Sequence, residues 1–146
     1  MAVDDLLIFL DSSFLFKLYV AEADSDQAFE LLESFAGTGV VTLLSDVEVA
    51  SGGYHGRSEE IVQRARQQYR TERLAGAFHQ VTLDDPVFDL ARQLGEKHAM
   101  QYKLRSLDIL HLATALHYGM VGFATYDDRL ILAATAFGLK LFPARS

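Results

Sequence analysis

Hydrophobic residues along this chain form short continuous runs separated by longer stretches with helical spacing. Short apolar runs of this kind are typical of strands buried in a parallel sheet. They are LLIFLD (6–11), VVTLLS (40–45), FHQVTL (78–83), GFATYD (122–127) and LKLF (139–142). Strands that alternate with helices predict an α/β fold, a three-layer α/β/α domain with a mainly parallel central sheet.

The stretches between these runs are predicted helices with recognisable ends. We expect them at 13–20, 24–37, from about residue 46 onward, 57–76, 85–100, 104–119 and 128–138. Asp85 and Pro86 open one of them in the order that suits a helix N-terminus. Gly52 and Gly53 should loosen the helix that begins near Asp46, because glycine is unfavourable inside a helix.

Asp108 is out of place in its predicted helix. Segment 104–119 is apolar on nearly every side, which is typical of a helix inside a fold. A buried carboxylate is costly unless it is protonated, paired or bound to a cation. As an alternative, Ser106 caps the helix and leaves Asp108 in the first turn, where the helix dipole favours negative charge.

The composition sets the broad class. A length of 146 residues predicts a single domain spanning 1–146. The absence of cysteine excludes disulfides, thiol catalysis and zinc–thiolate sites, and fits a reducing cytosol. Asp4 and Asp5 are unsuited to a signal peptide, and no run is long enough to span a membrane. We therefore expect a cytoplasmic protein with no membrane partner.

The charge makes the positions of the acidic residues important. Thirteen basic and twenty acidic residues give a net charge of −7. That sum argues against a nucleic-acid partner, since phosphate binding normally needs a basic surface. The objection weakens where several acids gather in one site and bind a divalent metal.

Four carboxylates from distant segments are expected to converge, namely Asp11, Glu48, Asp108 and Asp127. Three of them follow predicted strands, and ligands of open α/β sheets bind at the carboxyl ends of the strands. Converging carboxylates repel one another unless a cation lies among them. Oxygen ligands favour Mg²⁺ or Mn²⁺, and such a metal suits phosphodiester hydrolysis.

Three of these acids also have a purely structural interpretation. Asp11 and Asp127 stand where a side chain could cap the following helix. Ser45 and Glu48 have the S-x-x-E spacing of a capping box, which would fold Glu48 back onto Ser45.

Four segments resemble, in order and spacing, the motif blocks of PIN-domain proteins. They are FLDSSFLFKLY (9–19), TLLSDVEVAS (42–51), LRSLDILHLATALHYG (104–119) and FATYDDRLILAATAFGLKLF (123–142). The nearest group is the VapC-like toxins of toxin–antitoxin pairs. The resemblance covers essentially the whole chain and is weakest between Gly52 and Asp84.

This resemblance implies a PIN-like fold and an endoribonuclease that depends on Mg²⁺ or Mn²⁺ and cleaves structured RNA, often tRNA or rRNA. It also implies inhibition by a cognate antitoxin and assembly as a homodimer or a dimer of dimers. The family's acidic quartet falls on the same four carboxylates. Ser12 and Thr125 match supporting hydroxyl positions, while Asp128 stands where the family often has a basic or neutral residue.

Glycines after Glu48 depart from the family pattern. The segment SGGYHGR (51–57) carries three of them, where the family usually continues a well-formed helix. Two interpretations stay open, a mobile rim of the RNA groove and a helix that ends early.

Several further residues have two interpretations each. His111 lies one turn from Asp108 and suits a metal ligand or a base, but a packed histidine with a backbone or carboxylate partner is favoured. Lys17 and Arg129 are close in sequence to Asp11 and Asp127 and are candidates for contact with a substrate phosphate. Five arginines form a basic stretch, Arg57, Arg64, Arg66, Arg70 and Arg73. The Glu60–Arg64 spacing favours a solvated helix face over an RNA or antitoxin contact.

Two other enzyme classes fit poorly. A phospho-acceptor receiver domain needs a late lysine at a strand tip, whereas Lys140 lies within the last run. A haloacid-dehalogenase-like phosphatase needs D-x-D-x-T where this chain has DSSFL. A non-catalytic PIN-like module that binds RNA or protein remains as the alternative.

Overall fold

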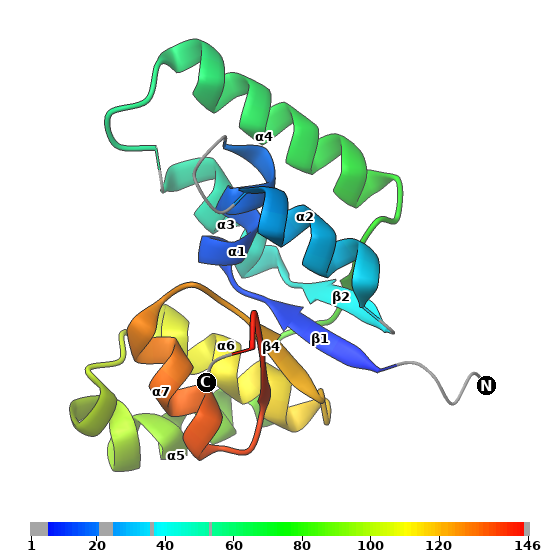
Figure 1. Ribbon diagram of the computed structural model, residues 1–146. Coiled ribbons are helices and arrows are strands. Elements are labelled where there is room, and N and C mark those ends of the chain that lie inside the picture. The colour runs from blue at the N-terminus through cyan, green and yellow to red at the C-terminus, as the bar shows by residue number, and fades with distance from the viewer. Residues whose placement is uncertain (1–5, 21–24, 36, 53, 145–146) are drawn as a thin grey trace.

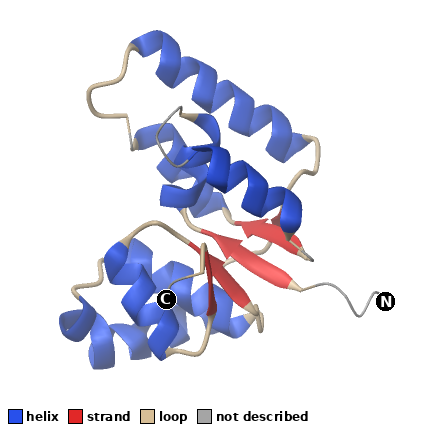
Figure 2. Ribbon diagram, viewed as in Figure 1, coloured by secondary structure: helices blue, strands red, loops and turns tan. Residues whose placement is uncertain are grey.

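The computed structural model describes residues 6–20, 25–35, 37–52 and 54–144. A five-stranded sheet, in which every pairing is parallel, lies between two layers of helices (Figures 1 and 2). The strands are β1 (Leu7–Leu10), β2 (Thr38–Val41), β3 (His79–Gln80), β4 (Gly122–Ala124) and β5 (Lys140–Phe142). This confirms the predicted three-layer α/β fold with a parallel sheet, while the single-domain assignment for 1–146 stays a prediction.

Helices cover both faces of the sheet. One layer holds α1 (Ser12–Tyr19), α2 (Ser25–Ser34), α3 (Leu43–Ser51) and α4 (Glu59–Leu74), and the other holds α5 (Asp85–Tyr102), α6 (Ser106–His117) and α7 (Asp128–Ala136) (Figure 2). Alternation along β1 produces the two cores: Phe9 packs in the α5–α7 core, whereas Ile8 and Leu10 pack in the α1–α4 core. Within the described residues, we find no helix both long and apolar enough to cross the lipid bilayer.

The predicted strand VVTLLS (40–45) is half wrong. The strand ends at Val41, and Thr42 caps α3 instead of continuing the sheet. The Thr42 side chain accepts a hydrogen bond from the Leu44 N–H, and the Ser45 side chain accepts one from the Thr42 N–H. This reciprocal capping box begins the helix inside the apolar run.

Other predicted boundaries shift for local reasons. The helix carrying Glu48 ends at Ser51 with Gly52 as its C-cap, which favours the early-ending interpretation of the glycine segment. Gly53, like parts of the predicted 24–37 helix, lies outside the described residues. The strand expected over 78–83 is reduced to His79–Gln80 at the edge of the sheet, where it pairs with β2 alone.

The strand order places a crevice between β1 and β4. The order is β3-β2-β1-β4-β5. The strands β2 and β3 are therefore added on one side of β1, and β4 and β5 are added on its other side. Such a switch point is where open α/β sheets bind ligands, at the carboxyl ends of the strands. Leu10 is paired with Ala124, and the Asp11 N–H donates to the Ala124 carbonyl at 3.0 Å. Asp11 and Thr125 are therefore neighbours at the mouth of the crevice.

Candidate metal centre

Asp11 is a buried carboxylate held by three donors. It follows β1, caps α1 and is only 3% exposed. Its Oδ2 accepts hydrogen bonds from the Ser13 N–H at 3.3 Å, the Ser13 hydroxyl at 2.7 Å and the Thr125 hydroxyl at 2.9 Å. Burial raises the pKa of Asp11, although His111 and the Ser13 hydroxyl partly oppose that shift. The side chain is thus fixed in one orientation at the crevice.

Glu48 reaches the same place from α3. Its Oε2 accepts a hydrogen bond from the Ser12 hydroxyl at 3.0 Å, and its Oε1 lies 2.5 Å from His111 Nε2. His111 is 1% exposed on α6, with its ring packed against Phe9 at a centroid distance of 4.9 Å. Burial alone would lower the pKa of His111, but Glu48, with smaller contributions from Asp11 and Asp108, holds it above its usual value.

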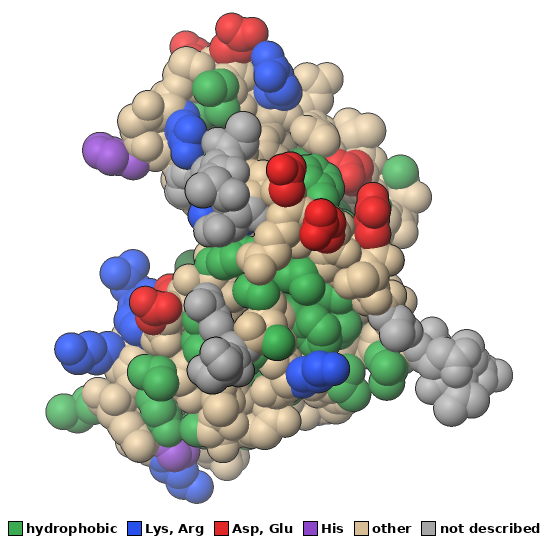
Figure 3. All heavy atoms as spheres, in the orientation of Figure 1, with side chains coloured by type: hydrophobic (Ala, Val, Ile, Leu, Met, Phe, Trp, Pro, Cys, Tyr) green, Lys and Arg blue, Asp and Glu red, His purple; other side chains and the backbone are tan. Residues whose placement is uncertain are grey.

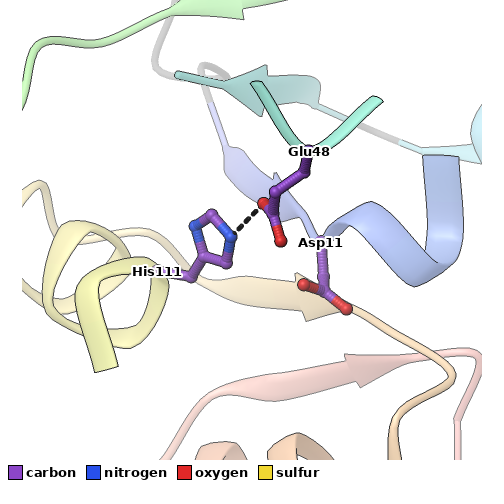
Figure 4. Close-up of side chains that lie close together, drawn as sticks. All are labelled: Asp11, Glu48 and His111. Atoms are coloured by element: carbon purple, nitrogen blue, oxygen red, sulfur yellow. Dashed lines mark hydrogen bonds and ion pairs between the residues drawn. The ribbon is translucent and has the colours of Figure 1, made fainter. Parts of the chain in front are cut away.

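Three side chains from three elements form a cluster that could hold a metal ion. One ligand atom from each of Asp11, Glu48 and His111 lies within 4.8 Å of the others, and all three side chains point toward a common space (Figure 4). Two carboxylates offer the oxygen ligands that Mg²⁺ and Mn²⁺ prefer. The donor set and its spacing therefore fit a hard divalent cation.

Asp108 and Asp127 lie outside this cluster and share a different partner. Arg129 Nη2 lies 2.9 Å from Asp127 Oδ2 and 3.6 Å from Asp108 Oδ2. Hydrogen bonds from Arg129 lower the pKa of Asp127 and outweigh the opposite effect of partial burial. Asp108 also accepts a hydrogen bond from the Arg105 N–H at 2.9 Å. The question raised by the apolar helix has a structural answer: Asp108 is paired.

The structural interpretations of the four acids have different outcomes. Asp11 and Asp127 do cap α1 and α7, so both capping predictions are confirmed. The Ser45–Glu48 capping box is wrong, because Ser45 bonds to Thr42 and Glu48 points into the crevice. Asp108 does lie in the first turn of α6, but the capping position belongs to Arg105 and not to Ser106.

The predicted supporting residues differ in their placement. Ser12 contacts Glu48, and Thr125 contacts Asp11 and accepts the Asp127 N–H at 3.0 Å. Asp128 is exposed at the start of α7. Ser13 was missed, although a serine two residues after a capping aspartate is a usual donor to that aspartate. His111 has the carboxylate partner that the favoured interpretation expected.

The candidate phosphate-contacting residues lie on several elements. The Lys17 ammonium lies 5.4 Å from the centre of the Tyr126 ring, and Arg57 is exposed after the Gly56 turn. Arg64 forms an exposed pair with Glu60 at 3.3 Å, as its spacing predicted. Figure 3 shows a hollow between the α4 side and the α5–α7 side of the molecule, with Lys and Arg side chains on both sides.

Most of the basic stretch faces a separate pocket between α3 and α4. The pocket has a volume of about 680 Å³ and is lined by Arg66, Arg70, Arg73 and Asp46, among others. Asp46 is paired with Arg73 at 2.8 Å and accepts a hydrogen bond from the Tyr69 hydroxyl at 2.8 Å. Because one acid faces three arginines, the pocket carries a net positive charge.

Comparison with known proteins gives a consistent family. The protein-family model of the PIN domain matches residues 8–137 of the sequence. The chain is 32% identical to Ribonuclease VapC47 of Mycobacterium tuberculosis (strain CDC 1551 / Oshkosh) over 139 residues, 90% of this chain and 93% of the relative.

Two solved structures from Mycobacterium tuberculosis share the fold. VapC20, described as a sarcin–ricin loop cleaving toxin, matches with a TM-score of 0.71 at 16% identity over 86% of this chain and 94% of that one. VapBC-5, a member of the VapBC family of toxin–antitoxin systems, matches with a TM-score of 0.62 at 15% identity over 97% and 99%. The chain therefore belongs to the PIN-domain family, and within it to the VapC-like proteins.

Proposed function

We propose that this protein is a metal-dependent endoribonuclease, the toxin of a toxin–antitoxin pair, which hydrolyses phosphodiester bonds in RNA. The observation that carries the proposal is the Asp11–Glu48–His111 cluster at the switch point of the sheet. The relative named as a ribonuclease supports the reaction, and the neighbour described as a sarcin–ricin loop cleaving toxin supports structured tRNA or rRNA as substrate. Because tRNA and rRNA take part in translation in the cytoplasm, we propose that the protein acts there.

The proposed catalytic residues are the quartet Asp11, Glu48, Asp108 and Asp127, with Mg²⁺ or Mn²⁺ held chiefly by Asp11 and Glu48. When bound, the ion supplies Lewis-acid chemistry, because it activates water at neutral pH and neutralises charge on the phosphate. Ser13 and Thr125 orient the carboxylate of Asp11. Ser12 and His111 hold the two oxygens of Glu48. These contacts preorganise both carboxylates before the ion or the RNA arrives.

Removal of the metal tests this function directly. We expect the wild-type protein to cleave a mixture of tRNA and rRNA in Mn²⁺ or Mg²⁺, to stop in EDTA and to recover when Mn²⁺ is restored. Because toxins of this kind choose few sites, new 5′ ends should be mapped by sequencing across the whole RNA mixture.

Two outcomes would contradict the proposal. Cleavage that persists unchanged in EDTA would exclude a metal-dependent reaction. The second outcome is that the wild-type protein binds Mn²⁺ and RNA but produces no new 5′ end. That result would favour the non-catalytic PIN-like module.

We also propose a cognate antitoxin as the protein partner, in line with the toxin–antitoxin neighbour. The pocket between α3 and α4 has the chemistry for an acidic, partly apolar peptide. Arg66 and Arg70 supply positive charge. Three exposed apolar side chains lie on the two helices that form the pocket, Leu43 at 60%, Val47 at 58% and Leu74 at 70%. A homodimer or a dimer of dimers stays a prediction.

Charge reversal in this pocket is expected to weaken antitoxin binding. Arg70→Glu should lower affinity about tenfold or more, because like charges across an interface are strongly unfavourable. Binding can be measured by titration with the cognate antitoxin. Arg64→Glu is the matched control, since Arg64 lies on the same helix but outside the pocket lining. Equal affinity of both variants would exclude this pocket as the docking surface.

A further inference from the structure

The guanidinium of Arg129 contacts Asp127 and Asp108, the two acids that lie outside the Asp11–Glu48–His111 cluster. Its Nη2 lies 2.9 Å from Asp127 Oδ2, and its Nε donates to Asp127 Oδ1 at 3.3 Å. The same Oδ1 accepts the Arg129 N–H at 2.9 Å. A bidentate arginine–carboxylate pair of this kind is among the stronger charge-assisted contacts in proteins. Both oxygens of Asp127 are thus engaged by one residue.

The guanidinium also ties Asp127 to neighbouring segments. Its Nη1 donates to the Lys103 carbonyl at 3.2 Å, and its Nη2 lies 3.6 Å from Asp108 Oδ2. The side chains of Arg129, Asp108 and Asp127 are 30%, 13% and 26% exposed, so the group is partly sheltered from water. One cation on α7 therefore faces two carboxylates, one on α6 and the one that caps α7.

A divalent ion and this guanidinium compete as positive partners of the same carboxylates. Arg129 already bonds both oxygens of Asp127, so a metal ion bound there would either displace the guanidinium from one oxygen or lie close to its positive charge. The hydrogen-bond partners of the Asp11 and Glu48 carboxylates in the described part of the chain are serine, threonine and histidine residues, and the ligand atoms of the Asp11–Glu48–His111 cluster lie within 4.8 Å of one another. The two carboxylate pairs therefore differ in which cation they can accept.

We propose that Arg129 takes the place of a second divalent metal: its guanidinium is the resident counter-ion of Asp108 and Asp127, and the protein binds a single Mg²⁺ or Mn²⁺ at Asp11 and Glu48. This inference rests on the proposed function and specifies the number of its metal ions. In this arrangement Asp108 and Asp127 supply negative charge and hold Arg129 in position, but they supply no ligand atoms to the metal. Arg129 is a positioning residue in this arrangement.

Counting bound Mn²⁺ tests the inference without reference to activity. Electron paramagnetic resonance of free Mn²⁺, recorded during titration of the full chain, gives the number and affinity of sites. We expect one ion per wild-type chain and two per Arg129→Gln chain, since the neutral side chain frees the carboxylates for a cation. Arg129→Lys, which keeps the charge, should bind one ion. Arg92→Gln removes a remote surface arginine paired with Glu96 and should also bind one.

Asp127→Asn provides a second variant should Arg129→Gln fail to fold. If Asp127 only holds Arg129, the affinity of the single Mn²⁺ should change about fivefold or less, as expected for a partly exposed charge pair. A loss beyond about a hundredfold, more than partners outside the ligand set typically cause, would make Asp127 a ligand and overturn the inference.

The remaining outcomes are also decisive. Two ions per wild-type chain, or one ion with unchanged affinity in a folded Arg129→Gln chain, would overturn the role of Arg129 and leave the metal-dependent nuclease standing. No Mn²⁺ binding by any of the proteins would overturn the metal centre of the proposed function together with this inference.

Discussion

Replacing Asp11 with asparagine should nearly abolish RNA cleavage while the protein stays folded. Asparagine keeps an oxygen that can accept the hydrogen bonds of Ser13 and Thr125, but it loses the charge that holds a divalent ion. Charge stabilisation by a catalytic metal is worth several kcal/mol, and about 4 kcal/mol corresponds to about a thousandfold in rate. Single-turnover cleavage at saturating Mn²⁺ measures the effect on the chemical step.

The same variant should also lose its response to metal in unfolding experiments. Mn²⁺ at about 100 times its Kd is expected to raise the free energy of unfolding of the wild type by about 2.7 kcal/mol. The Asp11→Asn protein should gain almost nothing. Its metal-free form should be at least as stable as the wild type at neutral pH, because burial raises the pKa of Asp11 above 3.8, so keeping this carboxyl ionised in the folded state lowers stability.

Asp89→Asn is the matched control for this substitution. Asp89 is exposed on α5, and the same chemical change there should leave both cleavage and the Mn²⁺ response intact. If Asp11→Asn cleaves RNA at the wild-type rate, Asp11 acts only as the cap of α1. If it cleaves slowly but keeps the full gain in stability from Mn²⁺, the ion binds elsewhere.

The positions of Asp11 and Asp127 could be predicted from sequence because sheet geometry leaves little choice. Asp11 directly follows β1 and Asp127 lies three residues after β4, and the two strands are neighbours, so both residues lie at the carboxyl end of the sheet. Glu48 was predicted to lie near Asp11, and it does, but the predicted end of the strand before it and the predicted Ser45–Glu48 capping box are wrong. Leu43 and Leu44 look like strand residues, and only the Thr42–Ser45 side-chain bonds show that the helix has already begun.

The division of the acids into two pairs could not be predicted. Their spacing along the chain is the same whether all four share one cation or not. The outcome depends on the rotamer of Arg129 and on how close His111 approaches Glu48, 63 positions away in sequence. The approach of Arg129 to Asp108 and the contact of His111 with Glu48 both join different elements of the fold, so they depend on tertiary packing. Helical spacing placed His111 one turn from Asp108 but did not indicate that its ring would face Glu48 and Asp11.

Replacing Phe9 with alanine should produce the largest loss of stability. Phe9 is fully buried in the central strand, and its ring stacks on Phe123 at a centroid distance of 5.2 Å. Truncation of a buried phenylalanine typically costs about 3–5 kcal/mol, a large share of the roughly 5–15 kcal/mol that stabilises a domain. Denaturant unfolding measures the loss. Phe29→Ala, at a position 41% exposed on α2, should change stability by about 1 kcal/mol or less.

Phe9 also connects the core to the candidate metal centre, because its ring lies against the His111 ring at 4.9 Å. Phe9→Leu separates the two roles: it keeps an apolar side chain, so it should cost only about 1–2 kcal/mol and leave the fold intact. It removes the flat surface that positions His111, and hence Glu48, so Mn²⁺ affinity should fall in this folded variant. A normal Mn²⁺ affinity would show that Phe9 stabilises the sheet alone and that Ser12 suffices to orient Glu48.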